Sequence, residues 1–278
     1  MVIHAYAKIN WTLAVTGRYE NGYHSLDTLM QTISLRDTLE IEDNDALILE
    51  NGYADDLVLR AARAIQKKAG FAKGARLRLT KRIPVRAGLG GGSADCAATL
   101  RGLNAFWQAN LTDEELYLLG ANLGADVPFC LAGGFCRVRG FGERVERMNA
   151  SPKAHLALYP VGGGLSTEEV FRAYDEGAGT ASVDTAGAAH ALSRGDFSLL
   201  AKYGGNSLEP AAIRLMPEIA DALQRLLDCG AEYARMTGSG SAVFGAFCDE
   251  ASARDAVRRM GTSAIYAETM GKDGMDYA

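Results

Sequence analysis

Short β-rich runs occupy the start of the chain and predict β-strands rather than helices. These runs are rich in β-branched and aromatic residues, and a turn-like stretch at 19–22 separates them. A later segment, ARLRLTKRI, alternates apolar and polar residues from Leu77 through Leu79 to Lys81, which predicts a half-exposed strand. The strands expected near the N-terminus are Val2–Tyr6, Trp11–Thr16 and Leu39–Ile41.

Apolar positions with helical spacing come next, flanked by residues that commonly begin or end helices. The segment LVLRAARAIQKKAG presents one apolar face and ends at Gly70, a residue type that suits a helix C-terminus. The alanine-rich segment from Ala94 to Trp107 predicts a second helix. The helix-start signals are Asp55 or Asp56 for the first segment, a capping box of Thr112 and Glu115 for a helix that continues to Gly124, and the same spacing at Ser166 and Glu169.

A boundary between two domains is expected after the segment SPK at 151–153, where a new strand, LALYP, begins. The second half continues with a low-complexity loop, GAGTASVDTAGAA, and then with further helices and strands. This order predicts two α+β domains, 1–152 and 153–278. The elements expected after the loop are a helix over Leu208–Leu227, a strand–loop–strand over Tyr233–Phe247 and a helix over Ser252–Met260.

The composition fits a globular protein with a small-molecule partner. Of 278 residues, 48% are hydrophobic, and the formal net charge of −5 includes no long run of either sign, so we expect no nucleic-acid partner. The five cysteines are widely spaced and form no Cys-x-x-Cys pair, which argues against a disulfide framework and a zinc site. No signal-like or membrane-spanning apolar segment is visible. A cytoplasmic location without a membrane partner is therefore expected, and the oligomeric state is left open.

The segment IPVRAGLGGGSADCAATL, residues 83–100, places four glycines in five positions between a predicted strand and a predicted helix. The start of a helix presents unpaired N–H groups and the positive end of the helix dipole. Glycines have no Cβ atom, so phosphate oxygens can approach these N–H groups closely. We interpret the loop as an anion site to which the Ser93 hydroxyl adds a donor or a metal contact; a flexible turn is the alternative. A Walker P-loop is excluded because no Gly-Lys-Ser/Thr follows, and protein-kinase motifs are absent. A dinucleotide fingerprint is weak because Ser93 stands in place of its third glycine.

PVRAGLGGGSADCAATL resembles the phosphate loop of the GHMP kinases, the small-molecule kinases named for galactose, homoserine, mevalonate and phosphomevalonate. AYAKINWTLAVTGRYENGYHSLDTLMQTI, LGADVPFCLAGG, STEEVF and RMTGSGSAVF, in that order, narrow the resemblance to members that phosphorylate a cytidine diphosphate derivative of methylerythritol in the non-mevalonate isoprenoid pathway. The similarity runs from Ala5 to Phe247. It implies a two-domain α+β fold, with a ribosomal-protein-S5-domain-2-like N-terminal domain, a ferredoxin-like C-terminal domain and an active site in the cleft between them.

The same resemblance implies roles for individual residues. Lys8 in AKIN and Asp126 in LGADVPF match the catalytic lysine and aspartate of the family. A carboxylate is the usual acceptor for the proton of an attacking hydroxyl, and a nearby ammonium keeps that carboxylate ionised. Asn10, Tyr23, His24 and Phe171 match substrate-binding positions, where aromatic rings flank the cytosine. ATP, carrying Mg²⁺ on its phosphates, would lie against Pro84, Val85, Arg86, Ala87, Gly88, Leu89, Gly90, Gly91, Gly92, Ser93 and Ala94, and no metal cluster of protein side chains is expected.

Some positions depart from the usual family pattern. Tyr6 replaces a proline, Ser207 an aspartate, and Asp56 an asparagine. A carboxylate at position 56 cannot donate the hydrogen bond that an amide donates, which puts one contact to the nucleotide base in question. Two further segments are rich in glycine. The resemblance implies that TGSGS at 237–241 is the family's third glycine motif, near the phosphates and the substrate, whereas the local sequence alone favours a hairpin connection. GGG at 162–164 is interpreted as a turn.

Each matched residue also has a purely structural interpretation. Without the resemblance, Lys8 is a solvated strand lysine, Asp126 the cap of a turn before Pro128, and Phe171 a core residue of its helix. Two alternatives for the whole protein follow. One is a GHMP kinase for an alcohol without a base, such as homoserine or a mevalonate derivative. The other is a nucleotide-binding or regulatory protein without turnover.

Overall fold

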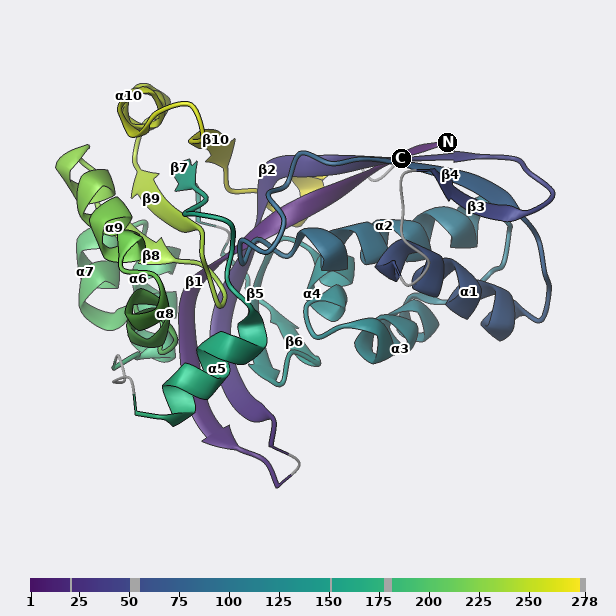
Figure 1. The fold of residues 1–278 in the computed structure, drawn as a ribbon, viewed down its shortest axis with the longest axis horizontal. Helices are drawn as coiled ribbons and strands as arrows, with labels where there is room; N and C mark the ends of the chain where they lie inside the picture. The colour runs from purple at the N-terminus through teal and green to yellow at the C-terminus, as the bar shows by residue number, and fades with distance from the viewer. Residues whose placement is uncertain (21, 51–55, 151, 178–181, 276–278) are drawn as a thin grey trace.

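Two β-sheets, each covered by helices, make up the molecule (Figure 1). The computed structural model describes residues 1–20, 22–50, 56–150, 152–177 and 182–275. The first sheet has the strand order β3-β4-β2-β5-β6, with β1 paired to β2, and the second has the order β10-β7-β9-β8. The strands are β1 (Val2–Arg18), β2 (His24–Glu42), β3 (Leu47–Glu50), β4 (Ala75–Thr80), β5 (Phe135–Gly140), β6 (Arg144–Arg147), β7 (His155–Tyr159), β8 (Tyr233–Met236), β9 (Val243–Phe247) and β10 (Ile265–Glu268).

Helices lie in two groups on either side of the long hairpin of β1 and β2 (Figure 1). Four of them, α1 to α4, cover the first sheet, and α6 to α10 lie around the second. No helix in the described part of the chain is long and apolar enough to cross a membrane. The helices are α1 (Leu57–Ala69), α2 (Gly91–Phe106), α3 (Asp113–Leu123), α4 (Val127–Ala132), α5 (Thr167–Asp175), α6 (Thr185–Ser193), α7 (Phe197–Tyr203), α8 (Glu209–Leu215), α9 (Glu218–Asp228) and α10 (Glu250–Met260), followed by the 3₁₀ turn η1 (Lys272–Gly274).

The first two strands are far longer than the short segments that the sequence predicted. β1 and β2 form one antiparallel pair whose register shifts at three places along β1. Most of β1 is buried on both faces, so its residues do not alternate between apolar and polar in the way that marks a half-exposed strand. The predicted strands Val2–Tyr6 and Trp11–Thr16 are therefore two parts of one element, and Leu39–Ile41 is only the end of β2.

Several predicted helix termini are confirmed by their hydrogen bonds. Asp56 accepts a bond from the Val58 amide at the start of α1, and Gly70 ends that helix with a left-handed φ of 72°. The capping box at the start of α3 is present in both directions. The second predicted capping box, at Ser166 and Glu169, is wrong, because Ser166 precedes α5 without a side-chain capping bond. Asp55 lies outside the described residues.

The second half of the chain holds more short elements than the sequence predicted. The helix expected over 208–227 is two helices, α8 and α9, because Pro217 restricts the preceding Met216 to a non-helical conformation. Part of the expected low-complexity loop is the helix α6, whose N-cap is Asp184, while 178–181 lie outside the described residues. The helix α7 and the strand β10 were not predicted.

Trp11 connects the two sheets. It is fully buried on β1 and contacts three rings of the second half, Phe197, Tyr233 and Phe244, at centroid distances between 5.5 and 6.2 Å. Its indole Nε1 donates a hydrogen bond of 2.7 Å to Gln31 Oε1 on β2. Because one apolar cluster contains residues of both halves, the division into domains 1–152 and 153–278 stays a prediction.

Replacement of Trp11 tests how much this shared core contributes. We expect Trp11→Ala to lower the free energy of unfolding by about 3–5 kcal/mol, since it removes a fully buried aromatic side chain and leaves a cavity. Urea unfolding followed by circular dichroism measures this change. The matched control is Leu118→Ala, a side chain that is 58% exposed and should change the free energy by no more than about 0.5 kcal/mol. Equal effects of the two substitutions would contradict the assigned core.

Candidate active site

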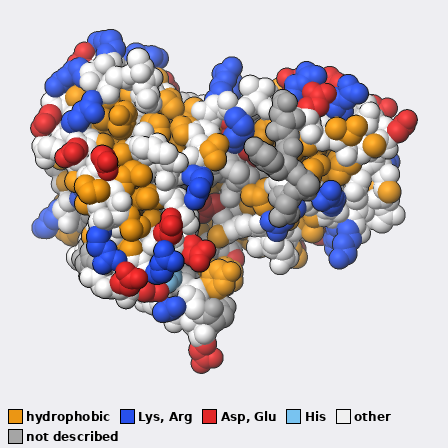
Figure 2. Space-filling model, viewed as in Figure 1, with side chains coloured by type: hydrophobic (Ala, Val, Ile, Leu, Met, Phe, Trp, Pro, Cys, Tyr) orange, Lys and Arg blue, Asp and Glu red, His pale blue; other side chains and the backbone are white. Residues whose placement is uncertain are grey.

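A cleft of about 1510 Å³ lies between the two halves of the molecule, and Figure 2 shows this face hollowed there. The loop before α2, the middle and end of β1, the turn into α4, the start of α5 and the loop after β8 all contribute to its wall. Every residue from Pro84 to Ser93 lines it, as do Lys8, Asn10 and Asp126. The cleft therefore brings together residues that lie more than a hundred positions apart in the sequence.

The glycine loop ends as the expected helix N-terminus. Gly90 occupies the N-cap position of α2 with a left-handed φ of 71° and no side-chain cap, so the first amides of α2 open toward the cleft. A Cβ atom on Gly90 would approach Lys8 Cγ to 2.9 Å, and the Lys8 amide donates a 3.0 Å bond to Leu89 O. The loop thus packs directly on β1. Ala94, by contrast, is buried in the core beneath the loop and does not line the cleft.

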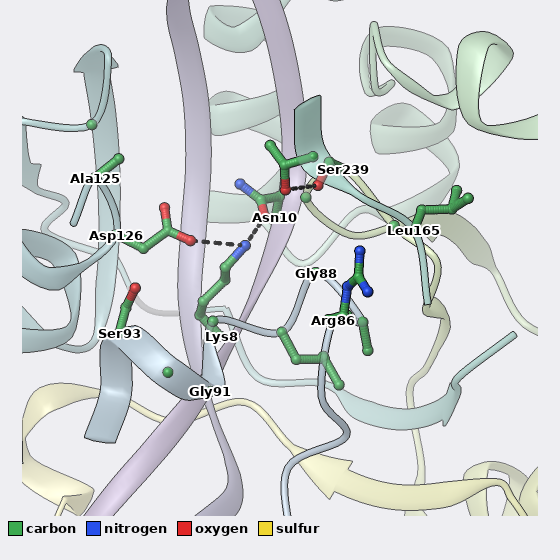
Figure 3. Close-up of a pocket in the computed structure, with 18 of the residues that line it drawn as sticks. Lys8, Asn10, Arg86, Gly88, Gly91, Ser93, Ala125, Asp126, Leu165 and Ser239 are labelled. Atoms are coloured by element: carbon green, nitrogen blue, oxygen red, sulfur yellow. Dashed lines mark hydrogen bonds and ion pairs between the residues drawn. The ribbon is translucent and has the colours of Figure 1, made fainter. Parts of the chain in front are cut away.

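Lys8, Asn10 and Asp126 form a connected polar group beside this loop (Figure 3). The Lys8 ammonium lies 3.5 Å from Asp126 Oδ2 and donates a 2.7 Å hydrogen bond to Asn10 Oδ1. The Asn10 amide group in turn donates to Thr28 Oγ1 at 2.8 Å. Lys8 is only 3% exposed, which contradicts its interpretation as a solvated strand lysine. A buried ammonium needs such partners to offset its lost hydration.

The turn into α4 presents Asp126 to the cleft. Asp126 directly precedes Val127 and Pro128, occupies the N-cap position of α4 and makes no side-chain capping bond. Its carboxylate is therefore not used as a turn cap. Instead it points toward Lys8, and its side chain is 36% exposed to the cleft.

The TGSGS segment lies against the glycine loop, between β8 and β9. Thr237 Oγ1 accepts a 3.0 Å hydrogen bond from the backbone amide of Asn10 and lies 3.3 Å from Gly88 O. A Cβ atom on Gly88 would come within 2.1 Å of Thr237 O, so only glycine fits there. The segment does connect two strands as a hairpin, but it also lines the cleft through Gly238, Ser239 and Gly240.

Aromatic residues gather at the far end of the cleft. His24 stacks on Phe171 of α5 with centroids 4.6 Å apart, and His24 Nε2 lies 2.7 Å from Asp175 Oδ1. Tyr23 is 66% exposed, and its ring lies 6.4 Å from that of Phe141 between centroids. All four rings line the cleft. Phe171 is only partly buried, so it is not simply a core residue of its helix.

The three departures from the family pattern each have a structural role. Asp56 caps α1 while also lining the cleft, so its carboxylate already accepts a backbone bond. The Ser207 hydroxyl accepts a 3.2 Å bond from the Val15 amide, and the Tyr6 hydroxyl accepts a 3.0 Å bond from Arg36.

A buried carboxylate pair near the phosphate loop escaped the sequence analysis. Lys81 lies just beyond β4, not within the strand as expected, and its ammonium bonds Asp37 Oδ2 at 2.5 Å and Asp95 Oδ2 at 2.6 Å. Asp37 also accepts a 2.8 Å bond from the Ile83 amide and so holds the beginning of the loop. The sequence offered one signal, a lysine directly after an alternating strand, but not its partners on β2 and α2.

Burial raises the pKa of Asp95 to about 7, with Lys81 opposing the shift and the nearby Asp37 adding to it. For Lys81, burial disfavours the ammonium, but attraction to Asp95 and the hydrogen bonds that the ammonium donates to both carboxylates prevail and raise its pKa. The Oδ1 atom of Asp95 has no hydrogen-bond partner among the described residues. One ammonium therefore serves two buried carboxylates.

The stability of the protein should reflect the raised pKa of Asp95. The folded state holds a proton that the unfolded chain, with a pKa of 3.8, releases, so this stabilisation is complete below about pH 4 and lost as the pH rises to about 7. Relative to wild type, Asp95→Asn should gain about 1 kcal/mol of unfolding free energy per pH unit between pH 5 and 7 and no more above that. Urea unfolding at pH 5, 6, 7 and 8 measures the difference, and a pH-independent value would contradict the prediction.

Comparison with known proteins shows to which family this chain belongs. Residues 56–134 match the family described as GHMP kinases N terminal domain, and residues 188–266 match GHMP kinases C terminal. The 4-diphosphocytidyl-2-C-methyl-D-erythritol kinase of Pelotomaculum thermopropionicum is 41% identical over 92% of both chains. The chain belongs to the GHMP kinase family and, within it, to the 4-diphosphocytidyl-2-C-methyl-D-erythritol kinases. The kinase of that name from Moorella thermoacetica is likewise 41% identical, over 97% of both chains.

A solved structure of a family member shares the fold described above. The crystal structure of a 4-(cytidine 5'-diphospho)-2C-methyl-D-erythritol kinase has a TM-score of 0.86, with 36% identity, over 98% of this chain and all of that one. The two-domain α+β class expected from the GHMP resemblance is therefore confirmed. Lys8 lies outside both matched family segments. Its position beside the glycine loop is known from the structure, in which the Lys8 amide on β1 donates a hydrogen bond to Leu89 O.

Proposed function

We propose that this protein transfers the γ-phosphoryl group of ATP to the 2-hydroxyl of 4-diphosphocytidyl-2-C-methyl-D-erythritol, a step in the non-mevalonate route to isoprenoid precursors. The relatives named for this reaction and the family's ATP-dependent chemistry support the substrate pair. The observation that carries the proposal is the Lys8–Asp126 ion pair of 3.5 Å directly beside the helix-opening glycine loop. An ammonium and a carboxylate in contact beside this loop support a transfer of phosphate to an alcohol.

In the proposed complex, the loop from Pro84 to Ser93 holds the phosphates of ATP. The amides at the start of α2 supply donors, and the left-handed Gly90 turns them toward the cleft. Mg²⁺ would arrive on the nucleotide, which supplies charge neutralisation of the phosphates. Oxygen donors suit this ion, and the Ser93 hydroxyl and the Asp126 carboxylate lie next to each other on that side of the cleft (Figure 3).

Asp126 then acts on the acceptor. Its carboxylate accepts the proton of the 2-hydroxyl as that oxygen bonds to the γ-phosphorus and the bond to the β–γ bridging oxygen breaks, releasing ADP. Lys8 stabilises the negative charge that develops on the attacking oxygen. Asn10 holds the Lys8 ammonium through a 2.7 Å bond, so the cation is positioned before the substrate enters.

At the other end of the cleft, the ring cluster offers a pocket for the cytosine. His24, Tyr23 and Phe171 supply aromatic faces, and the hydrogen bond of His24 Nε2 to Asp175 orients the imidazole. An alcohol without a base would leave these faces unused. We also propose that the reaction takes place in the cytoplasm. All five cysteines are free thiols, and free thiols are typical of proteins in a reducing compartment.

Removal of either proposed catalytic group tests the mechanism. Asp126→Asn keeps the size of the side chain but cannot accept the hydroxyl proton, and Lys8→Met keeps the buried stem but removes the charge. Both should lower kcat at least about a hundredfold, the effect expected from loss of acid–base catalysis. ADP release with ATP and the cytidine diphosphate acceptor measures turnover. Wild-type-like turnover in either variant would refute the assigned role.

The phosphate loop has its own test in Gly92→Ala. Gly92 lines the cleft, and the nearest atom to an added Cβ is Leu57 Cδ1 at an ordinary 3.5 Å, so the variant should fold with unchanged or slightly higher stability. The methyl group would nevertheless crowd the phosphate oxygens and raise KM for ATP about tenfold, equivalent to one lost charged hydrogen bond. Gly163→Ala, which meets nothing within 4 Å, is the control. An unchanged KM would contradict phosphate binding at this loop.

A panel of alcohols separates the proposal from its alternatives. Homoserine and mevalonate have no base for the ring cluster to hold, so their kcat/KM should be at least about a hundredfold below that of the cytidine diphosphate acceptor. Equal or better turnover of one of them would assign the protein to that substrate. Binding of ATP without phosphorylation of any alcohol would instead favour a nucleotide-binding protein without turnover.

A further inference from the structure

Arg86 has an unusual backbone conformation in the middle of the phosphate loop. Its φ is 56°, in the left-handed region that side chains other than glycine and asparagine rarely adopt. Among the described residues, only Gln108 and Asn110, in the turn after α2, share this feature. For an arginine this conformation costs about 1–2 kcal/mol, and such strain persists only where the surrounding structure imposes it.

Contacts from the second half of the molecule impose it here. A Cβ atom on Gly164 would lie 2.6 Å from Arg86 O and 2.8 Å from Arg86 Cβ, so the GGG turn packs tightly on this residue. The next residue, Ala87, accepts a 3.1 Å hydrogen bond from the Ala242 amide, after the TGSGS segment. The turn at 162–164 therefore packs on Arg86 and restricts the backbone of this residue beside the cleft.

Two of the basic side chains that line the cleft, Arg86 and Arg172, have no ion pair in the described part of the chain, and of these two only Arg86 belongs to the phosphate loop. Five basic side chains line the cleft, and three of them are ion-paired: Lys8 with Asp126, Arg18 with Asp175, and Lys81 with Asp37 and Asp95. Within the part of the chain that the structure describes, Arg86 has no ion pair or side-chain hydrogen bond. Figure 3 shows its guanidinium extending from the loop past Gly88 toward Leu165, away from Lys8.

We propose that Arg86 binds phosphate oxygens of a nucleotide in the cleft and so contributes to the affinity of this enzyme for that nucleotide. A guanidinium offers a planar set of N–H donors that fits two phosphate oxygens at once. The inference rests on the proposed function, which brings two polyphosphates into the cleft, the triphosphate of ATP and the diphosphate of the acceptor. Either group has the required chemistry, and an unpaired cation at the strained turn of the loop is placed to bind it.

The experiment compares Arg86→Ala, Arg86→Lys and Arg86→Gly. We expect Arg86→Ala to raise KM for ATP or for the acceptor about tenfold, with a smaller change in kcat, and Arg86→Lys to retain part of the affinity. A higher KM for ATP assigns the guanidinium to the triphosphate, and a higher KM for the acceptor assigns it to the diphosphate. Arg82→Ala, which removes the same charge outside the cleft, is the matched control and should leave both KM values unchanged.

Arg86→Gly distinguishes binding from a structural role. Glycine adopts the left-handed conformation without strain, so the melting temperature should be equal to or above that of wild type while KM rises as in Arg86→Ala. Titration calorimetry with ADP and with CDP as separate probes measures binding without turnover, so a failure of the proposed reaction would not obscure the result. The proposal is overturned if Arg86→Gly binds both probes within twofold of wild type.

Discussion

The close packing of Gly88 against Thr237 is the contact on which the cleft depends. The two loops meet only because residue 88 has no side chain, since a Cβ atom would overlap the Thr237 carbonyl oxygen. Through this contact Thr237 reaches β1, where it accepts a bond from the Asn10 amide, and Asn10 in turn holds the Lys8 ammonium. One chain of contacts therefore positions the phosphate loop, the third glycine segment and the buried lysine relative to one another.

Charge is distributed in the cleft so that buried ions are paired before any ligand enters. Burying an ammonium costs several kcal/mol unless oxygen atoms replace its water. Lys8 obtains these oxygens from Asn10 and Asp126. At the base of the loop the buried carboxylates of Asp37 and Asp95 share the ammonium of Lys81, which is itself 34% exposed. The pairing keeps Asp126 accessible, at 36% exposure, while the lysine beside it is almost completely covered. A polar substrate atom can thus approach the carboxylate without first displacing a protein contact.

Local chemistry predicted the elements that are defined by a few neighbouring residues. The Asp56 cap, the capping box before α3 and the glycine-opened helix α2 depend on hydrogen bonds within one turn, so their sequence signals were sufficient. Predictions failed where distant packing prevails. The long β1 is buried on both faces and so lacks the alternation that marks a strand, and the partners of Lys81 lie on β2 and α2, 44 and 14 positions away.

The sequence by itself determined the class of chemistry, because a glycine-rich helix start and a recognisable order of motifs depend on residue identity alone. It also named Lys8, Asp126 and the residues of the phosphate loop. Only the tertiary structure decided that Lys8 is buried against Gly90, that His24 stacks on Phe171, and that Gly164 packs on the backbone of Arg86. These relations join segments far apart in the chain, and the burial that fixes them exists only once both sheets have packed around Trp11.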